Sequence, residues 1–352
     1  MKSPLKKSAS ILFPLLLLSL TASAGGGFAR AWKRFNNWLE QGQLSGIDTN
    51  YVQVPRLNRQ VYFGGYAYWQ NYQMNMPFNV EDASMIVRGI NDKDHYHLDA
   101  HTWQAEIDFG IDWKGLAIEI PIPIQNNYLS SLGIAKNGSV WGARLRYKHL
   151  QDMDGNCNIG NQLINRDDNE IFIFFAEGYY VLKHRRFSLA AGLYADMVQK
   201  RSAGSPLLYA NYYRSHYKVS KLFPANFDSF RTQQVSVGAG YAYNLSFLQG
   251  RLVFHASLVP MFSIYNQLKH RADFDQSEDN DLEKWNDLYH AADHGNAVFH
   301  VNAFARFAAN YSFDRYIVSL LANYRSFAYA NNLKLKIRNQ EADIQLNFCT
   351  RF

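Results

Sequence analysis

The chain has 352 residues, of which 47% are hydrophobic and 19% are charged, and this excludes a disordered protein. Aromatic residues make up 15%, yet the mean hydropathy of -0.31 excludes a bundle of membrane-spanning helices. Two cysteines exclude a disulfide scaffold and a cysteine-based zinc site, and a formal net charge of +6 gives no reason to expect a nucleic-acid partner.

Residues 1–24 predict a secretory signal peptide. Lys2, Lys6 and Lys7 form a basic start, an apolar run follows over 11–20, and Ala22-Ser23-Ala24 supplies the small residues of a cleavage site. The apolar run is too short to span a bilayer as a helix, which disfavours an uncleaved signal anchor. We therefore expect an exported protein that begins at Gly25.

Residues 25–59 predict a periplasmic segment that contains a short amphipathic helix. Its apolar residues recur at helical spacing, and basic residues lie on the opposite face. The apolar set is Phe28, Ala31, Trp32, Phe35, Trp38 and Leu39. Such a helix can lie on a membrane surface, or it can dock on the periplasmic mouth of a barrel; the pattern leaves both open.

From residue 60 onward the dominant pattern is alternation, with apolar side chains on one face of each segment and polar or small ones on the other. Most of these segments exceed ten residues, the length that a tilted strand needs to cross a bilayer. Trp69, Trp103, Trp113 and Trp141 stand near segment ends, where aromatic girdles lie. We expect an all-β, antiparallel outer-membrane β-barrel over 60–352; the alternative is a secreted sandwich with long strands.

The barrel is expected to have 12 strands, with 10 as the alternative, because single-chain bacterial barrels have even counts. Eleven segments are readable: 60–72, 103–113, 115–124, 139–149, 170–181, 187–200, 232–246, 251–267, 297–312, 315–329 and 342–352. Tight links at 113–115, 183–186, 247–250 and 313–314 suit periplasmic turns. Long polar links at 73–102, 201–231, 268–296 and 330–341 suit extracellular loops. The spacing of the tight links places the error between 115 and 181.

Charged residues of both signs are expected to point into the lumen. They are Glu106, Asp108, Asp112, Arg144, Arg146, Lys148, Asp196, Lys200, Arg306, Arg325, Asp343 and Arg351. In a narrow barrel such charges pair and fill the interior, which favours a closed structural barrel of the envelope. A passive channel for small solutes is the alternative that 12 strands permit. Cys157 and Cys349 could form a disulfide in an oxidising compartment.

Metal and catalytic constellations are weak. His95, His97 and His101 form the densest histidine cluster, but no matched second ligand pair accompanies them. His290 and His294 lack an H-E-x-x-H pattern, and 152–156 resembles the start of a calcium loop without the later Glu, so a turn is expected there. We expect no cofactor and no metal.

Catalysis has only one candidate group of residues. Ser257 and His255 share an inward face with His300, as in barrels that act on lipids, but no motif links them to a carboxylate. The chain is therefore not expected to be an enzyme, and a lipid-modifying barrel is a further alternative.

Five stretches resemble a Bacteroidota family known only as domain of unknown function 4421. They are Gly46–Pro55, Phe187–Ala191, Gln199–Ser205, Gly238–Asn244 and Pro260–Tyr265. They occur in the family's order along nearly the whole mature chain. The resemblance implies an outer-membrane barrel and supplies no activity, catalytic residue or ligand.

The C-terminus resembles an assembly signal for outer-membrane barrels. Ile344, Leu346, Phe348, Thr350 and Phe352 share one face of the last strand, although Thr350 stands where an aromatic residue is usual. We expect 342–352 to pair with 60–72, because an unpaired edge in lipid leaves backbone groups unsatisfied. Expected partners are outer-membrane lipid, lipopolysaccharide and the barrel assembly machinery, which reads Phe352.

Overall fold

The computed structural model describes residues 26–44, 46–57, 59–77, 95–124, 131–159, 162–218, 227–272, 286–290, 301–330 and 336–352. Its helical elements are α2 (Gly26–Leu44), α4 (Leu189–Leu193) and η2 (Leu248–Gly250). Its strands are β1 (Val52–Gln53), β2 (Arg59–Pro77), β3 (His95–Trp113), β4 (Leu116–Pro123), β5 (Ser131–Lys136), β6 (Trp141–Ile159), β7 (Gln162–Val181), β8 (Val198–Gln199), β9 (Ala203–Lys218), β10 (Phe227–Phe247), β11 (Leu252–Ala272), β12 (Asn286–His290), β13 (Val301–Phe313), β14 (Tyr316–Ala330) and β15 (Lys336–Arg351). No helix of the described residues is long and apolar enough to cross a membrane.

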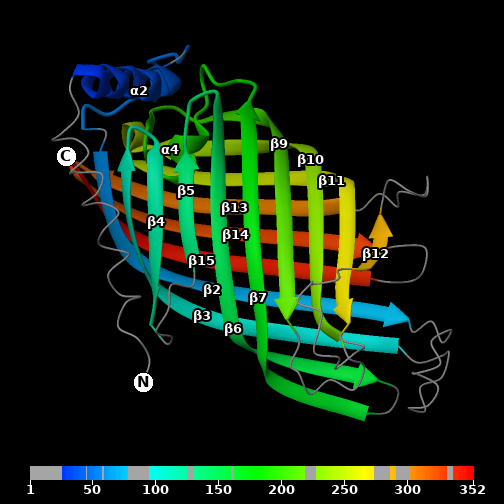
Figure 1. The fold of residues 1–352 in the computed structure, drawn as a ribbon. Coiled ribbons are helices and arrows are strands. Elements are labelled where there is room, and N and C mark those ends of the chain that lie inside the picture. Colours follow the sequence, from blue (N-terminus) through cyan, green and yellow to red (C-terminus); the bar gives the residue numbers. More distant parts are fainter. Residues whose placement is uncertain are drawn as a thin grey trace.

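Twelve antiparallel strands close into a barrel, with the short β12 appended to β11 (Figure 1). The ring follows chain order from β2 round to β11 and β13–β15, and β10 pairs with β11 along most of its length. β15 pairs with β2 from Arg351 opposite Gln60 to Lys336 opposite Asn75, and Phe352 N–H donates to Arg59 O at 3.0 Å. The predicted barrel of 12 strands and its closure through the last strand are both confirmed.

Alternation along each strand separates an apolar outer wall from a polar and aromatic interior. On β4, for example, Ile118, Ile120 and Ile122 are exposed on the outside, whereas Glu119 is buried inside. Trp103 and Trp141 lie exposed on the outer wall, as expected for girdle residues. The outer wall therefore has the composition of a lipid-facing surface.

Three segments differ from the sequence-based list. The predicted strand 187–200 is wrong: it forms α4 and β8 inside the barrel, between β7 and β9. The predicted extracellular link 201–231 is also wrong, because β9 occupies 203–218 and pairs with β7 and β10. The strand missed between 115 and 181 is β5, which is only six residues long. The C-terminal residue Phe352, the segment 187–200 and the tight turns all lie at one end, which we call the periplasmic end.

The barrel narrows from its periplasmic end to its other end. β4 and β5 pair only as far as Glu119 opposite Gly133, and beyond this hairpin β3 pairs directly with β6. Ile124 N–H donates to Ala105 O, so even-numbered residues of β4 bond to β3 and odd-numbered ones face β5. Pro121 and Pro123 therefore offer no N–H on the β5 side, which ends that pairing without leaving unsatisfied donors. Twelve strands surround the periplasmic half and ten surround the far half (Figure 1).

The helix predicted from the aromatic spacing forms as α2 and docks on the periplasmic rim (Figure 1). Trp32 packs on Trp113 with ring centres 4.7 Å apart, and Trp38 lies 6.3 Å from Trp141. Lys114 of the β3–β4 turn forms an ion pair with Glu40. α2 therefore contacts the outward-facing girdle tryptophans rather than entering the lumen.

Candidate functional site

The segment from Phe187 to Lys200, which we call the plug, fills the wide periplasmic half of the lumen. All five residues of α4 are buried. Ser188 caps this short helix, because its hydroxyl accepts a hydrogen bond from Ala191 N–H at 3.1 Å. After the helix the chain returns through β8, which pairs with β1 in a separate two-stranded sheet. The plug is thus a folded element rather than a loose loop.

Gln199 and Asn244 hold the two ends of the plug together. The side-chain amide of Gln199 donates to Arg186 O at 2.7 Å and to Arg201 O at 2.9 Å. Its oxygen accepts from Ser188 N–H at 3.0 Å and from Asn244 Nδ2 at 3.1 Å. Every polar atom of this buried Gln199 side chain is therefore bonded, as a stable buried polar group requires.

The barrel wall binds the plug from several strands. Asn244 of β10 donates to Ser188 O at 2.7 Å, and Asn310 of β13 donates to Gly192 O at 2.5 Å. Farther round the same half of the ring, Gln60 of β2 donates to Ala195 O at 3.1 Å, and the guanidinium of Arg351 on β15 donates to the same oxygen. Because these anchors come from four strands, the plug cannot tilt aside without breaking several buried hydrogen bonds.

A hydrogen-bonded chain joins Ser257, His255 and Asn244 beside the plug. His255 Nδ1 lies 2.7 Å from Asn244 Oδ1, and His255 Nε2 lies 3.1 Å from Ser257 Oγ. Since Asn244 Nδ2 donates elsewhere, its Oδ1 must accept, so His255 carries its proton on Nδ1 and Nε2 accepts from the Ser257 hydroxyl. This order of donors and acceptors is the one that a serine nucleophile and its base require.

Above the plug, ion pairs cross the lumen. Arg306 of β13 pairs with Glu177 of β7, and Glu119 of β4 bonds both Arg144 and Arg146 of β6 at 3.1 and 3.0 Å. A further set links β6 to β14 and β15: Arg146–Asp343 (3.9 Å), Lys148–Glu341 (3.6 Å), Arg325–Asp343 (3.2 Å) and Arg325–Glu341 (3.5 Å). These side chains are almost fully buried, so each charge depends on its partner.

Aromatic rings fill the narrow end of the lumen. Phe304 lies 5.6 Å from Phe175 and 5.9 Å from Phe327, and Tyr213 stacks on Phe327 at 4.1 Å. Tyr72 and Tyr217 stack at 5.0 Å. All are buried, and they belong to the largest apolar cluster of the described residues. The described lumen residues therefore form three successive layers: plug, ion pairs and aromatic rings.

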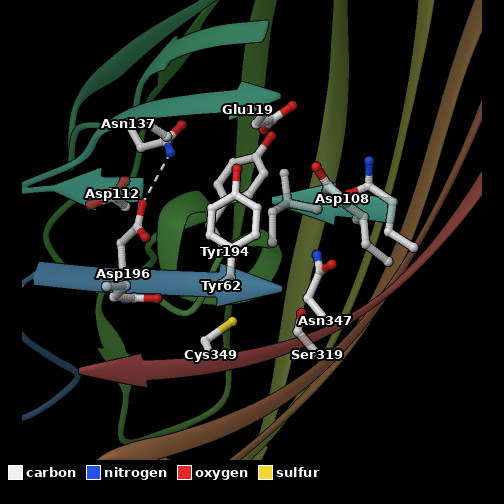
Figure 2. A pocket seen from close by; sticks show the side chains of 15 residues that line it. Tyr62, Asp108, Asp112, Glu119, Asn137, Tyr194, Asp196, Ser319, Asn347 and Cys349 are labelled. Atoms are coloured by element: carbon white, nitrogen blue, oxygen red, sulfur yellow. Dashed lines mark hydrogen bonds between the residues drawn. The ribbon is translucent and has the colours of Figure 1, made fainter. Parts of the chain in front are cut away.

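A small acidic cavity remains between the plug and the wall (Figure 2). Its volume is about 40 Å³, which suffices for about three water molecules. Asp108, Asp112 and Glu119 line it from the wall, and Asp196 lines it from the plug, where Asn137 donates to its carboxylate at 3.0 Å. Burial, together with the nearby charge of Asp112, raises the pKa of Asp196 well above its usual range. This arrangement can hold water and a proton.

The structure places the predicted lumen residues as follows. Buried inside the barrel on wall strands are Glu106, Asp108, Asp112, Arg144, Arg146, Lys148, Arg306, Arg325, Asp343 and Arg351. Asp196 is buried too, but the prediction that it stands on a strand is wrong, since it belongs to the plug. Lys200 ends the plug at the surface and donates to Thr49 O. Sequence reasoning missed Glu119 and Glu177, which bind the arginines, although both stand at inward positions of readable strands.

The remaining candidate sites lie largely outside the described residues. His95 and His97 belong to β3, but their side chains lie outside the described residues. His294 and His300 also lie outside the described residues, and His101 is exposed. In the part of the chain that the structure describes, no three His, Cys, Asp or Glu residues are placed to hold a metal. The turn expected at 152–156 is wrong, because β6 runs through it with an irregular register. Cys349 is a free, buried thiol in the part of the chain that the structure describes, whereas the side chain of Cys157, its possible disulfide partner, lies outside that part.

Comparison with solved structures finds distant barrels. The outer membrane protease OmpT from Escherichia coli is 8% identical, with 84% of this chain and 96% of that chain covered and a TM-score of 0.38. The β domain of the Bordetella autotransporter BrkA is 10% identical, with 81% and 98% covered and a TM-score of 0.34. The toluene transporter TodX of P. putida is 7% identical, with 85% and 91% covered and a TM-score of 0.22. None of these likenesses is close enough to bring an activity to this chain.

No curated protein matches the chain. A family described as a domain of unknown function, DUF4421, matches residues 47–352, which include all twelve barrel strands and the plug. The chain therefore belongs to the DUF4421 family.

Proposed function

We propose that this protein is a structural barrel of the outer membrane whose lumen is permanently closed. The observation that carries the proposal is the anchoring of the plug from both sides of the ring: Asn244, Asn310 and Gln60 bind it from the half between β10 and β2, and Asn137, between β5 and β6, binds Asp196 from across the ring. A segment that opens as a gate would need one side without such bonds. The ion pairs above the plug add a second barrier, because an ion would need a large free energy to pass through a layer of buried, paired charges.

Export and location belong to the same proposal. A signal peptide over 1–24 would be removed, the assembly machinery would insert the barrel, and outer-membrane lipid would surround the apolar wall. The exposed isoleucines of β4 support this placement, since they would be unfavourable in water. The test is fractionation with N-terminal sequencing: we expect an outer-membrane protein that starts at Gly25. A soluble periplasmic protein would contradict it.

A passive channel is the competing function that a twelve-stranded barrel permits. Two cavities among the described lumen residues have volumes of about 40 and 20 Å³, which hold a few waters and no sugar. Proteoliposome swelling decides between the two functions. We expect arabinose to enter liposomes containing this protein no faster than protein-free liposomes, with a general porin as the positive control. Swelling at a rate near that of the porin would establish a channel.

Acyl hydrolysis is a second candidate, and the Ser257–His255–Asn244 chain is the observation in its favour. The same chain also lies against the plug, because a Cβ on Gly192 would stand 2.6 Å from His255 Nδ1. A fluorophosphonate probe tests the candidate. Labelling that disappears in Ser257→Ala but persists in Ser263→Ala would support hydrolysis. Absence of labelling in detergent and in membranes would indicate that Ser257, His255 and Asn244 only anchor the plug.

A further inference from the structure

Two arginines contact one tyrosine ring at the periplasmic mouth of the barrel. The guanidinium carbon of Arg186 lies 5.1 Å from the centre of the Tyr51 ring, and that of Arg201 lies 5.7 Å from it. Both arginines are exposed. Lys200, which precedes Arg201, donates through Nζ to Thr49 O at 3.0 Å. We call Tyr51, Arg186, Lys200 and Arg201 the mouth cluster.

The plug fixes the position of the mouth cluster. Arg186 precedes the plug and Arg201 follows it, and the buried side-chain amide of Gln199 donates to the backbone oxygens of both. Lys200 N–H donates to Tyr51 O at 2.7 Å. An apolar cluster joins the segment around Tyr51 to the plug: Ile47, Tyr51, Val52, Val54, Ala191 and Met197. Since α4 of the plug lies at the end of the barrel where α2 and the C-terminus lie (Figure 1), the mouth cluster faces the aqueous side of this mouth rather than the lipid.

Cations outnumber carboxylates around the mouth cluster. Lys183 and Arg185 of the turn after β7 are also exposed, and with Arg186, Lys200 and Arg201 they make five cations. Asp48 stands beside this turn, because its N–H donates to Arg185 O at 2.7 Å, but its Oδ1 accepts from Asn50 N–H at 3.0 Å. Among the described residues, no Asp or Glu forms an ion pair with any of the five. Like charges gathered on one exposed surface attract an anionic partner.

No further acid of the chain is placed to balance this surplus. The other described acids of the periplasmic end have different surroundings: Glu40 pairs with Lys114, Asp112 and Asp196 line the buried cavity, and Asp314 belongs to the β13–β14 turn. Residues 1–25, 45 and 58, which the structure does not describe, contain no Asp or Glu. The acids whose side chains are not described belong to, or continue from, the far ends of the strands: they fall within 81–94, 152–168, 228 and 273–293.

The chemistry of the mouth cluster suits a chain that carries several carboxylates. The planar fork of a guanidinium matches the two oxygens of a carboxylate. Cation–π contact with Tyr51 limits the movement of both arginines, so less side-chain entropy is lost when a ligand binds. An exposed ion pair contributes little by itself, so a useful affinity requires a ligand that offers carboxylates repeatedly. These conditions favour an acidic polymer of the periplasm over a lipid headgroup.

We propose that the mouth cluster binds the carboxylates of cell-wall peptides, the short acidic peptides that cross-link peptidoglycan beneath an outer membrane. Arg186 and Arg201 each pair with a carboxylate, Lys200 adds a third positive charge, and the Tyr51 ring holds the two guanidinium groups in place. Such binding would attach a closed barrel to the cell wall, which gives the proposed structural role a partner. The inference rests on the proposed outer-membrane location.

The test is co-sedimentation of the full-length, folded barrel in detergent with purified peptidoglycan sacculi. The probes are untreated sacculi and sacculi whose carboxylates have been converted to amides, and phosphatidylglycerol added to the micelles serves as a competitor. The cluster variant is R186Q/R201Q. Its matched control is R251Q/R315Q, which removes equal charge from exposed residues of the β10–β11 and β13–β14 turns. Heat-modifiable gel migration verifies that each variant is folded.

We expect R186Q/R201Q to bind untreated sacculi at least about tenfold more weakly, and the control to bind as the wild type does. R186K/R201K keeps the charge and loses the fork, so an intermediate loss is expected; this variant carries the test if R186Q/R201Q does not fold. Equal binding to amidated sacculi, displacement by phosphatidylglycerol or an equal loss in the control would overturn the proposal. Failure of a non-conducting, outer-membrane barrel to sediment with sacculi rejects the mouth cluster alone, whereas a conducting barrel that still binds them rejects the closed lumen alone.

Discussion

Arg306 and Glu177 form a buried ion pair across the barrel, between strands that β9, β10 and β11 separate. Arg306 also donates to Tyr209 Oη at 2.6 Å. The pair connects walls that share no backbone hydrogen bond, so it fixes the diameter of the lumen at the level directly above the plug. The proposed closure of the lumen therefore depends on charge pairing as well as on the plug.

Removal of one partner of this pair should be severe. In Glu177→Gln, the guanidinium of Arg306 stays buried without its counter-charge, and we expect a loss of about 3–5 kcal/mol in the free energy of unfolding. The double variant Glu177→Gln/Arg306→Met should recover most of the loss. Urea unfolding in detergent, followed by tryptophan fluorescence, measures both. Glu170→Gln, in a partly exposed pair, is the control and should change stability by less than about 1 kcal/mol. Equal losses in the two single variants would contradict burial of the pair.

The plug should not tolerate a methyl group at Gly192. A Cβ there would lie 2.3 Å from Asn244 Oδ1 and 2.6 Å from His255 Nδ1, which form the anchor described above. We expect Gly192→Ala to destabilise the plug by about 1–3 kcal/mol. Faster hydrogen exchange at 189–193, with the strands unaffected, is the readout. Gly65→Ala is the matched control, because nothing lies within 4 Å of its Cβ. Unchanged exchange in the first variant would refute the close packing.

Plug stability should fall as pH rises. Burial and Asp112 raise the pKa of Asp196, while Asn137, Arg351 and Lys136 oppose this effect. The unfolded carboxyl has a pKa of about 3.9, so the folded state retains a proton that the unfolded state loses above that value. Stability from this group is thus complete below about pH 4 and declines as pH rises toward the raised pKa.

Asp196→Asn isolates that effect, because the amide keeps an acceptor for Asn137 and cannot ionise. We expect the variant to lose part of the pH dependence of protection at 189–193 and to be more stable than the wild type at pH 7. Hydrogen exchange measured from pH 5 to pH 8, corrected for intrinsic rates, gives the comparison. A parallel pH dependence in the two proteins would show that Asp196 does not titrate in this range.

The aromatic face of α2 should lie in the membrane interface as well as on the rim. Phe35 stacks between Trp32 and Trp38 at 5.9 Å from each, and all three remain partly exposed beside the girdle. Trypsin should therefore cleave at Lys33 and Arg34 more slowly in liposomes than in detergent. Phe35→Ser should reduce this protection severalfold, whereas cleavage at the exposed Arg185 should not change. Equal cleavage in liposomes and detergent would show that α2 docks on protein alone.

Deletion of Phe352 should reduce assembly. Its N–H closes the barrel onto Arg59, and its exposed ring stands at the periplasmic interface. We expect less heat-modifiable barrel in the membrane fraction, and near-normal amounts in Phe352→Tyr. Wild-type amounts from the deletion variant would remove the assembly role.

The wall could be predicted from sequence where the two faces differ in polarity. β10 and β11 follow this rule, with Val237 and Phe262 outside and Ser236 and Ser263 inside. β5 was not recognised in the sequence because a strand of six residues shows too little alternation. The extent of its pairing also depends on the prolines of β4. β9 was missed because its second half reverses the rule: Tyr213 and Tyr217 face the lumen, whereas Arg214 and Lys218 lie on the outward face.

The plug could not be recognised, because both of its alternating sets are apolar or small. Leu189, Ala191 and Leu193 suggest one face of a strand, but Ala190 and Gly192 are buried too, since the segment is surrounded by wall on every side. Inward charges were readable from alternation, whereas their partners depend on strands far apart in sequence. The Ser257–His255–Asn244 chain needs the β10–β11 register, which no local pattern encodes.

Single-channel recording in planar bilayers tests the closed lumen most directly. The wild-type protein, inserted and verified as folded, should give no stepwise current in potassium chloride at either polarity. A general porin recorded in the same bilayers shows that the assay detects an open barrel. Stable, reproducible conductance steps from the wild-type protein would contradict the account, because they would show that ions pass the plug and the Arg306–Glu177 layer.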